Sequence, residues 1–222
     1  SMSIVAFSTA AMTVCENVTM DETGKQIVRQ GIARLVPDGC TNILHGLRAG
    51  LHTFVNDTSI GKVKTMFLLT DGEPSDMTSN AYLANEIKRF KRENNVHCIV
   101  NIAGFGYALD SQLLYNTAKG NGSDFFIPDH SMLATTFING IANCRRVIAL
   151  DVTAQVYMPD QPAPSETKIS HVLSGQHRTE VLANTTSGVP PQRVAVSYYN
   201  ISRGRVETFV HENVVMTLDP SS

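Results

Sequence analysis

The sequence predicts an α/β domain with a doubly wound, mostly parallel sheet, followed by an all-β module. Strand-like apolar runs alternate with helix-like periodic segments up to residue 148, the order typical of right-handed strand–helix–strand units. The run Lys64–Thr70 is apolar without alternation, as in a strand that helices cover on both faces. The helical period stops near Leu150, and short alternating segments follow.

Two strands and two helices are predicted before the central strand. The strands are Ser3–Ser8 and a short one around Met12–Glu16. A helix opens at Asp21, because acidic residues favour a helix start. Its expected buried stripe is Val28, Ile32 and Leu35. The second helix follows Cys40, and Thr41 or Asn42 can cap it with a side-chain oxygen. Its expected stripe is Leu44, Leu47, Leu51, Phe54 and Val55.

The central strand Val63–Thr70 ends at the polar pair Asp71-Gly72, and further helices and strands alternate after it. We expect a helix at Ser79–Glu93 whose face of Lys88, Arg89, Lys91 and Arg92 is solvated and interleaved with Glu86 and Glu93. The remaining elements are expected at Val96–Ala103, at a short helix capped by Asp110, at Asp124–Ile127 and at Ser131–Arg146.

The all-β module is predicted from five alternating segments with turn residues between them, which favours a β-sandwich. The segments are Asp151–Met158, Thr167–Leu173, Thr179–Ala183, Arg193–Tyr199 and Arg205–Leu218. We therefore expect two domains, 1–148 and 149–222.

The composition excludes several classes of protein. The chain has 222 residues, of which 42% are apolar and 17% charged, as in a folded globular protein. A net charge of −2 argues against a nucleic-acid surface or strong membrane attraction. Four scattered cysteines without a C-x-x-C pair argue against a zinc cluster. Because no signal peptide is visible, we expect a reducing cytoplasmic or nuclear location.

Asp71 is the first candidate for function, because open α/β sheets bind ligands at the carboxyl ends of their strands. The alternative is plain turn chemistry, since Asp-Gly often follows a strand. Thr41 opens the helix before the central strand, so it can reach the same edge, although it too has a simpler role as a helix cap. A hydroxyl and a carboxylate together are oxygen ligands of the kind that Mg²⁺ prefers.

Four segments, in this order and spacing, resemble a von Willebrand factor A domain over residues 3–148. They are Ser3–Thr9, Gly39–Ile43, Phe67–Gly72 and Val100–Gly106. The resemblance implies a Rossmann-like fold and a metal-ion-dependent adhesion site, in which a D-x-S-x-S loop, a threonine and an aspartate hold Mg²⁺ or Mn²⁺. The metal then binds an acidic residue of a partner protein. By motif match, Thr41 and Asp71 are the second and third elements, and the expected partner contacts are Thr9, Asn42, Gly72, Glu73 and Ser75.

The first element of that site is absent from the sequence. The family places a strand, D-x-S-x-S and a helix before the strand found here at Ser3, whereas this chain contains no D-x-S-x-S. We expect the neighbours of that strand to lack a partner or to be forced together. Truncation of a longer protein and natural loss of metal binding are both open, and truncation is preferred. Metal is accordingly expected to be absent or weakly held.

The sequence therefore predicts a non-enzymatic protein-interaction module with a degenerate or truncated metal site. An A-like domain followed by a β module is similar to intracellular proteins of which some carry U-box or RING segments. Neither segment is present, so ligase activity would belong to other parts of a longer parent. The alternatives are a metal-assisted hydrolase that uses Asp71 with Glu73 or Asp76, and a structural unit that forms homo-oligomers or strand-swapped dimers.

Overall fold

The computed structural model describes residues 1–55, 57, 59–71, 80–106, 110–177 and 191–212. The chain forms two compact units. The α/β unit comprises residues 1–59 and 63–144, and the β unit comprises residues 60–62 and 145–222. Within the described ranges, no helix is long and apolar enough to cross a membrane.

The α/β unit begins with an antiparallel pair of strands and a helix that packs on it. The strands are β1 (Met2–Phe7) and β2 (Ala11–Val18), and the helix is α1 (Glu22–Ala33). The predicted start of α1 is confirmed, because the Asp21 carboxylate accepts a hydrogen bond from the Gly24 N–H at 2.8 Å.

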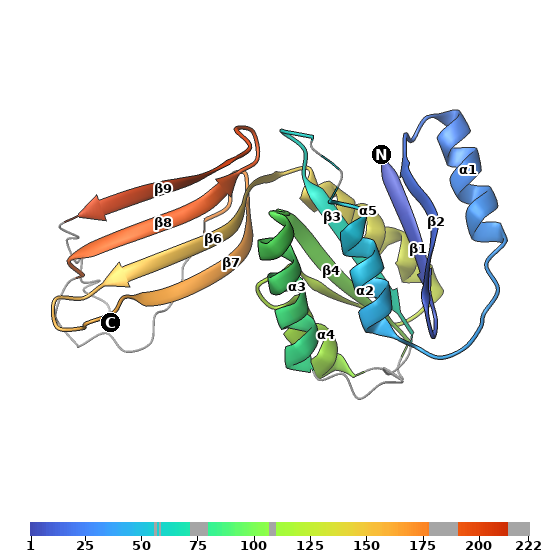
Figure 1. Cartoon of the computed structure of the whole chain (residues 1–222), viewed down its shortest axis with the longest axis horizontal. Coiled ribbons are helices and arrows are strands. Elements are labelled where there is room, and N and C mark those ends of the chain that lie inside the picture. Colours follow the sequence, from blue (N-terminus) through green and yellow to red (C-terminus); the bar gives the residue numbers. More distant parts are fainter. Residues whose placement is uncertain (56, 58, 72–79, 107–109, 178–190, 213–222) are drawn as a thin grey trace. The chain divides into compact units, whose positions relative to one another are not determined.

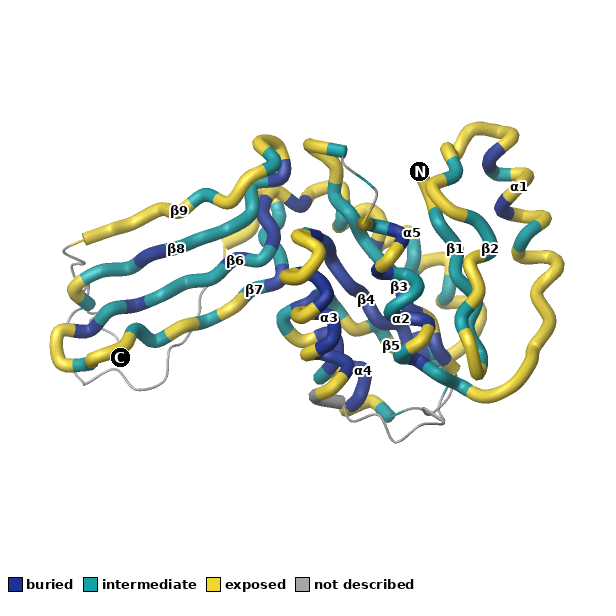
Figure 2. Tube along the Cα trace, in the orientation of Figure 1, coloured by how far each residue is buried: buried dark blue, intermediate teal, exposed yellow. Residues whose placement is uncertain are grey.

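The predicted buried stripe of α1 is wrong in two of its three positions. Val28 is buried, whereas Ile32 is 50% exposed. Leu35 lies beyond the end of the helix, which is capped at Arg34, and is also exposed. The reason is packing, because α1 packs mainly against β2 and only a narrow line of its surface is covered. Figure 2 shows α1 mostly exposed, in contrast to α2 and α3 over the larger sheet.

The larger sheet of this unit has three parallel strands with helices on both faces. Its order is β3 (Lys64–Thr70), β4 (Cys98–Phe105) and β5 (Asp124–Ile127). The helices are α2 (Ile43–His52), α3 (Asn80–Asn94), α4 (Ser111–Ala118) and α5 (Leu133–Cys144), with a short 3-10 turn, η1, at His130–Met132. Figure 1 shows α2, α3 and α4 together on one side of these strands. The predicted parallel, helix-covered sheet is confirmed.

Side-chain packing explains why helices cover both faces. On one face, buried side chains of α2, α3 and α4 surround Leu68 and Val100 of the sheet. On the other face, the ring of Phe67 lies 5.3 Å from that of Phe137 on α5. Gly140 brings α5 close, since a Cβ at that position would lie 2.7 Å from Phe67. Alternate apolar side chains of β3 thus pack into two hydrophobic layers, one on each face of the sheet.

The two sheets of the α/β unit are not joined to each other. Among the described residues, β1 is hydrogen-bonded to β2 alone, and β3 is hydrogen-bonded to β4 alone. Of the two outcomes expected around an absent first strand, the structure shows the first: the strands are not forced together. Instead, α2 packs against β1, β2 and β3 and so connects the two sheets through side chains.

The β unit contains one four-stranded antiparallel sheet. Its order is β7 (Ser165–Leu173), β6 (Val147–Tyr157), β8 (Arg193–Asn200) and β9 (Arg205–Glu212). The predicted all-β module is confirmed. The second sheet expected of a sandwich is not found in the described part of the unit, and the predicted strand Thr179–Ala183 lies outside the described residues.

A cluster of charges at the turn between β8 and β9 makes this sheet sensitive to acid. Hydrogen bonds from Arg203, Asn200 and Arg205 lower the pKa of Glu207 from 4.5 to about 2. The folded pKa is lower than the unfolded one, so this carboxylate stabilises the fold above pH ~4.5, and the contribution disappears as the pH falls toward 2. We expect Arg203→Gln to raise the pKa of Glu207, as an NMR titration of the side-chain carboxyl carbon would show. An unchanged titration would contradict the assigned cause.

Candidate functional site

The candidate site lies where β1 and β3 end and α2 begins. Figure 1 shows β1 and β3 running in the same direction toward the end of the unit at which α2 starts. Backbone hydrogen bonding joins two of the loops there, because the N–H of Asn42 donates to the carbonyl of Ser8 at 2.8 Å. The segments that resemble the family at Ser3–Thr9 and Gly39–Ile43 are therefore neighbours in space.

Thr9 and Gly39 explain the close fit of these loops. The N–H of Cys40 donates to the Thr9 hydroxyl oxygen at 3.2 Å. Gly39 has φ +68°, and a Cβ there would lie 2.5 Å from the same hydroxyl oxygen. A side chain at position 39 would thus be strained in its backbone and would displace Thr9. The Thr9 hydroxyl, expected as a partner contact, here holds a loop.

The two residues before α2 have separate roles. Asn42 is the helix cap, since its Oδ1 accepts a hydrogen bond from the His45 N–H at 3.0 Å. This decides between the two predicted caps and commits the amide oxygen of Asn42 to the helix. Thr41, next to it, is half-buried and does not cap the helix. Thr41 therefore keeps the role of a candidate oxygen ligand.

Asp71 directly follows β3 and is exposed. Parallel pairing sets Thr70 opposite Gly104, so Asp71 lies beside the end of β4 as well. Within the described residues, no hydrogen bond joins Asp71 to Thr41. Three expected partner contacts, Gly72, Glu73 and Ser75, lie outside the described residues, as does Asp76 of the hydrolase alternative.

The residues present at this edge do not fit a complete metal site. The described part of the chain holds no group of three or more His, Cys, Asp or Glu that could bind a metal ion. Thr41 and Asp71 supply two oxygens, whereas Mg²⁺ requires near-octahedral coordination. The Thr9 hydroxyl and the Asn42 amide oxygen already accept backbone hydrogen bonds. We therefore assign no chemical step to a bound metal.

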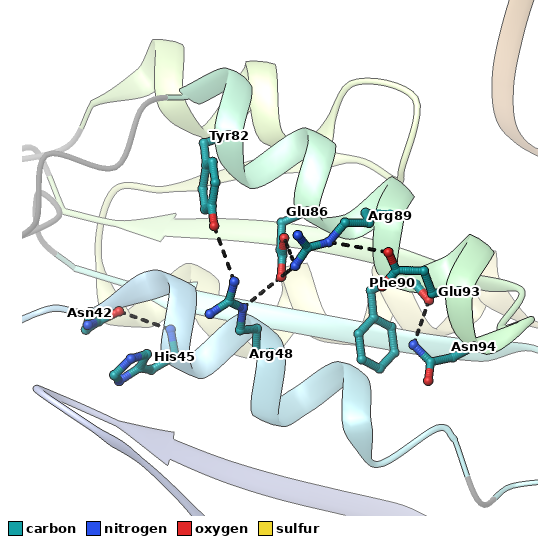
Figure 3. A network of polar contacts seen from close by, with 9 residues as sticks. All are labelled: Asn42, His45, Arg48, Tyr82, Glu86, Arg89, Phe90, Glu93 and Asn94. Carbon is teal, nitrogen blue, oxygen red and sulfur yellow. Dashed lines mark hydrogen bonds and ion pairs between the residues drawn. The ribbon is translucent and has the colours of Figure 1, made fainter.

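A buried carboxylate holds α2 against α3 near this edge, as Figure 3 shows. Glu86 is 5% exposed and accepts hydrogen bonds from Arg48 of α2 at 2.7 Å and from Arg89 of its own helix at 2.8 Å. Arg48 also donates to the hydroxyl of Tyr82 at 3.3 Å. The hydrogen bond with Glu86 is the main cause that raises the pKa of Arg48. This ion pair fixes the helix that carries the Asn42 cap.

The predicted solvated face of α3 is wrong at two positions. Glu86 was expected among exposed charges but is buried beneath two arginines. Lys91 is also buried, and its ammonium group donates to the carbonyl of Cys98 at 2.9 Å. The spacing of Glu86 and Arg89 indicates their pairing within the helix. Nothing in the local sequence indicates Arg48, which is 38 residues away from Glu86.

Comparisons with known proteins find similar solved structures but no match to a family model or to a curated protein sequence. No family model matches the chain, and no curated protein matches it. A von Willebrand factor type A protein from Catenulispora acidiphila superposes with a TM-score of 0.67 and 18% identity. The match covers 95% of this chain and 56% of that chain, so this chain spans little more than half of that protein's length.

Two further structures match the α/β fold. Proximal thread matrix protein 1 from the mussel byssus has a TM-score of 0.52 and 22% identity over 67% of this chain and 37% of that one. BatB from Bacteroides thetaiotaomicron has a TM-score of 0.50 and 13% identity over 64% of this chain and 78% of that one. The parallel sheet covered by helices and these structural likenesses agree. The α/β unit of this chain has the von Willebrand factor A fold.

Proposed function

We propose that the chain is a protein-interaction module whose partner docks on the edge formed by Ser8, Thr9, residues 39–42 and Asp71, here called the docking edge. The observation that carries the proposal is the hydrogen bond from Asn42 to Ser8, which assembles two loops at the end of β3 where Asp71 is exposed. Ligands of open α/β sheets bind at such strand ends. The von Willebrand factor A fold of the unit supports the same class of function.

The docking edge is a degenerate form of a metal-dependent adhesion site in this proposal. Thr41 and Asp71 hold Mg²⁺ or Mn²⁺ weakly, because two oxygen ligands leave most of the coordination to water. A partner's acidic residue therefore gains little binding free energy from the metal. Instead, the Asp71 carboxylate accepts hydrogen bonds directly from the partner. Carboxylate acceptors make stronger hydrogen bonds than neutral ones, which suits an exposed recognition residue.

The hydrogen bonds at the docking edge also help to distinguish a binding function from the enzyme alternative. A hydrolase would need a second carboxylate or a nucleophile with a base beside Asp71. No described residue hydrogen-bonds to Asp71, while Glu73 and Asp76 lie outside the described residues. The hydrogen bonds at the edge instead hold loops in place, which favours binding over catalysis.

A cytoplasmic or nuclear location is part of the proposal. All four cysteines are free thiols in the structure, and Cys40 is exposed at the docking edge. An exposed thiol persists more readily in a reducing compartment.

A quantitative pull-down tests the docking edge. The whole chain, Asp71→Ala and Asp160→Ala are immobilised and exposed to extract from the source cells, with Mg²⁺ or with EDTA. Asp160 is an exposed aspartate of the β unit and serves as the matched control. We expect a protein retained by the wild type to fall about tenfold or more with Asp71→Ala, as for loss of a charged hydrogen bond. We expect little change with Asp160→Ala or EDTA.

Three outcomes would count against this proposal. Equal retention by Asp71→Ala and the wild type would remove the docking edge from the interaction. Complete loss of retention in EDTA would show that partner binding depends on a bound metal and so contradict the degenerate site. Hydrolysis of phosphoesters or amides by the wild type that Asp71→Ala abolishes would favour the enzyme alternative.

A further inference from the structure

The loop before α2 contains an Asp-Gly pair, Asp38-Gly39, and both of its residues are exposed. In such a pair the backbone nitrogen of glycine can attack the carboxyl carbon of the aspartate side chain, because glycine has no Cβ that hinders the approach. The product is a succinimide ring. Whether a folded chain permits the attack depends on the hydrogen bonds and the burial of the two residues.

Both reacting groups of Asp38-Gly39 are without protein partners. Among the described residues, no hydrogen bond or ion pair engages the Asp38 carboxylate or the N–H of Gly39. The pair also lies outside the helices, after the end of α1 at Ala33 and before the start of α2 at Ile43. No protein hydrogen bond therefore has to break before the nitrogen reaches the carboxyl carbon.

Two Asn-Gly pairs of the same unit are protected by their structure. Asn121 is 1% exposed, and the N–H of Gly122 donates to the carbonyl of Ala118 at 2.9 Å. Asn139 and Gly140 lie within α5, where helical hydrogen bonds engage the backbone N–H groups. Asparagine is intrinsically more reactive than aspartate in this chemistry. The two Asn-Gly pairs are therefore internal controls for the effect of the fold.

The fold retains the reactive pair because position 39 requires glycine. Gly39 has φ +68°, and a Cβ there would lie 2.5 Å from the Thr9 hydroxyl oxygen. A larger residue would hinder the attack on Asp38 but would be strained at this position. The same close fit leaves little room for a longer backbone next to Gly39.

We propose that Asp38 converts to isoaspartate in the native chain and that this change loosens the loop of residues 39–42. The Gly39 nitrogen bonds to the side-chain carboxyl carbon of Asp38, and the carboxyl hydroxyl leaves with the amide proton as water. A solvent water then cleaves the bond between the backbone carbonyl carbon of Asp38 and the Gly39 nitrogen. The backbone now runs through the side chain of residue 38 and is one methylene longer, and the former carbonyl is a carboxylate.

The extra methylene enters the chain directly before a hydrogen-bonded part of the loop. The N–H of Cys40 donates to the Thr9 hydroxyl oxygen at 3.2 Å, and the N–H of Asn42 donates to the carbonyl of Ser8 at 2.8 Å. A longer backbone before Gly39 displaces these donors from their acceptors. The reaction and the loosening do not depend on the proposed function, although they lie at the docking edge.

Storage of the folded whole chain in heavy-oxygen water tests the reaction. The chain is kept in mildly acidic buffer, digested in ordinary water and analysed by mass spectrometry with electron-transfer fragmentation. We expect isoaspartate at position 38 that carries one heavy oxygen atom, while Asn121 and Asn139 remain amides. The variant Asp38→Glu should lose the signal at position 38, because glutamate has to close a larger ring. In urea, Asn121 and Asn139 should react as well.

Amide hydrogen exchange measures the loosening of the loop. The isoaspartate form is separated by chromatography and compared with the unmodified chain by NMR. We expect the amides of Cys40 and Asn42 to exchange about tenfold faster in the isoaspartate form, as for the loss of a hydrogen bond. The amides of residues 98–105 in β4 should keep their rates, which separates a local change from unfolding.

Two results would overturn the proposal. One is the absence of isoaspartate at position 38 in the folded chain while the chain in urea forms it, because the fold then protects the pair. The other is isoaspartate at position 38 with unchanged exchange of Cys40 and Asn42, because the loop then accommodates the extra methylene. Equal partner retention by Asp71→Ala and the wild type would remove the proposed function without affecting either measurement.

Discussion

Replacing Leu47 by alanine is expected to lower the free energy of unfolding of the α/β unit by about 2–5 kcal/mol. Leu47 is 0% exposed in the middle of α2, within the core that also contains Leu51 and Leu68. Removing its branched side chain loses the transfer free energy of three carbon atoms and leaves a cavity. The cost is high here because α2 packs against both sheets. The helix therefore cannot move to fill the cavity without losing contacts with one of the sheets.

Urea unfolding followed by circular dichroism at 222 nm measures this effect. All helices described in the structure belong to the α/β unit, so the helical signal reports on that unit. The matched control is Leu35→Ala, which truncates a 39% exposed leucine after α1 and should cost less than about 0.5 kcal/mol. Equal losses in the two variants would contradict the central position of α2.

The second large effect is expected from Glu86→Gln, at about 1–3 kcal/mol of destabilisation. The substitution keeps the size of the side chain but removes the charge that two arginines share. Arg48 and Arg89 are partly exposed and can turn to water, so the loss stays below that for a fully buried pair. Because α2 is then held less firmly to α3, we also expect faster amide exchange at the start of α2.

A neighbouring glutamate of the same helix provides the control. Glu93 is exposed and lies 3.9 Å from the Arg89 guanidinium, so Glu93→Gln should change stability by less than about 0.5 kcal/mol. Urea unfolding of the two variants at low and high salt separates them further, because salt screens the exposed pair more. A Glu86→Gln variant as stable as the wild type would show that the buried carboxylate does not hold the helices together.

Much of the fold follows from local patterns in the sequence. The unbroken apolar run before Asp71 predicts a covered parallel strand, and β3 is one. Asp21 and Asp110 were expected at helix starts, and both cap helices. These predictions succeed because hydrophobic periodicity and helix capping depend on residues that are close together in the sequence.

Predictions that needed tertiary information failed for a physical reason. The stripe of α1 has helical spacing, yet Ile32 stays exposed because this helix packs mainly against β2 of a two-stranded sheet. Glu86 and Lys91 alternate with other charges like a solvated face, yet both are buried by partners far away in the sequence. A local pattern states that a helix has an apolar face, but not how much of that face its neighbours cover.

The candidate site was predictable in its position but not in its hydrogen bonding. Strand ends and the resemblance place Thr41 and Asp71 at one edge of the sheet. The role of Thr9 as a loop support depends on a backbone N–H group that the sequence does not locate, whereas Asn42 was one of the two predicted helix caps. Thr9 and Asn42 were both expected as partner contacts, and both side chains instead accept hydrogen bonds from backbone N–H groups of the chain itself.

The most direct test of the docking edge is amide hydrogen exchange of the chain bound to the partner that the pull-down retains. The account predicts that exchange slows at residues 8–9, 39–42 and 71, while the sheet of the β unit exchanges as in the free chain. Because bound backbone is shielded from solvent, protection maps the contact surface without relying on any substitution. Protection confined to residues 147–212, with the docking edge unchanged, would contradict the account.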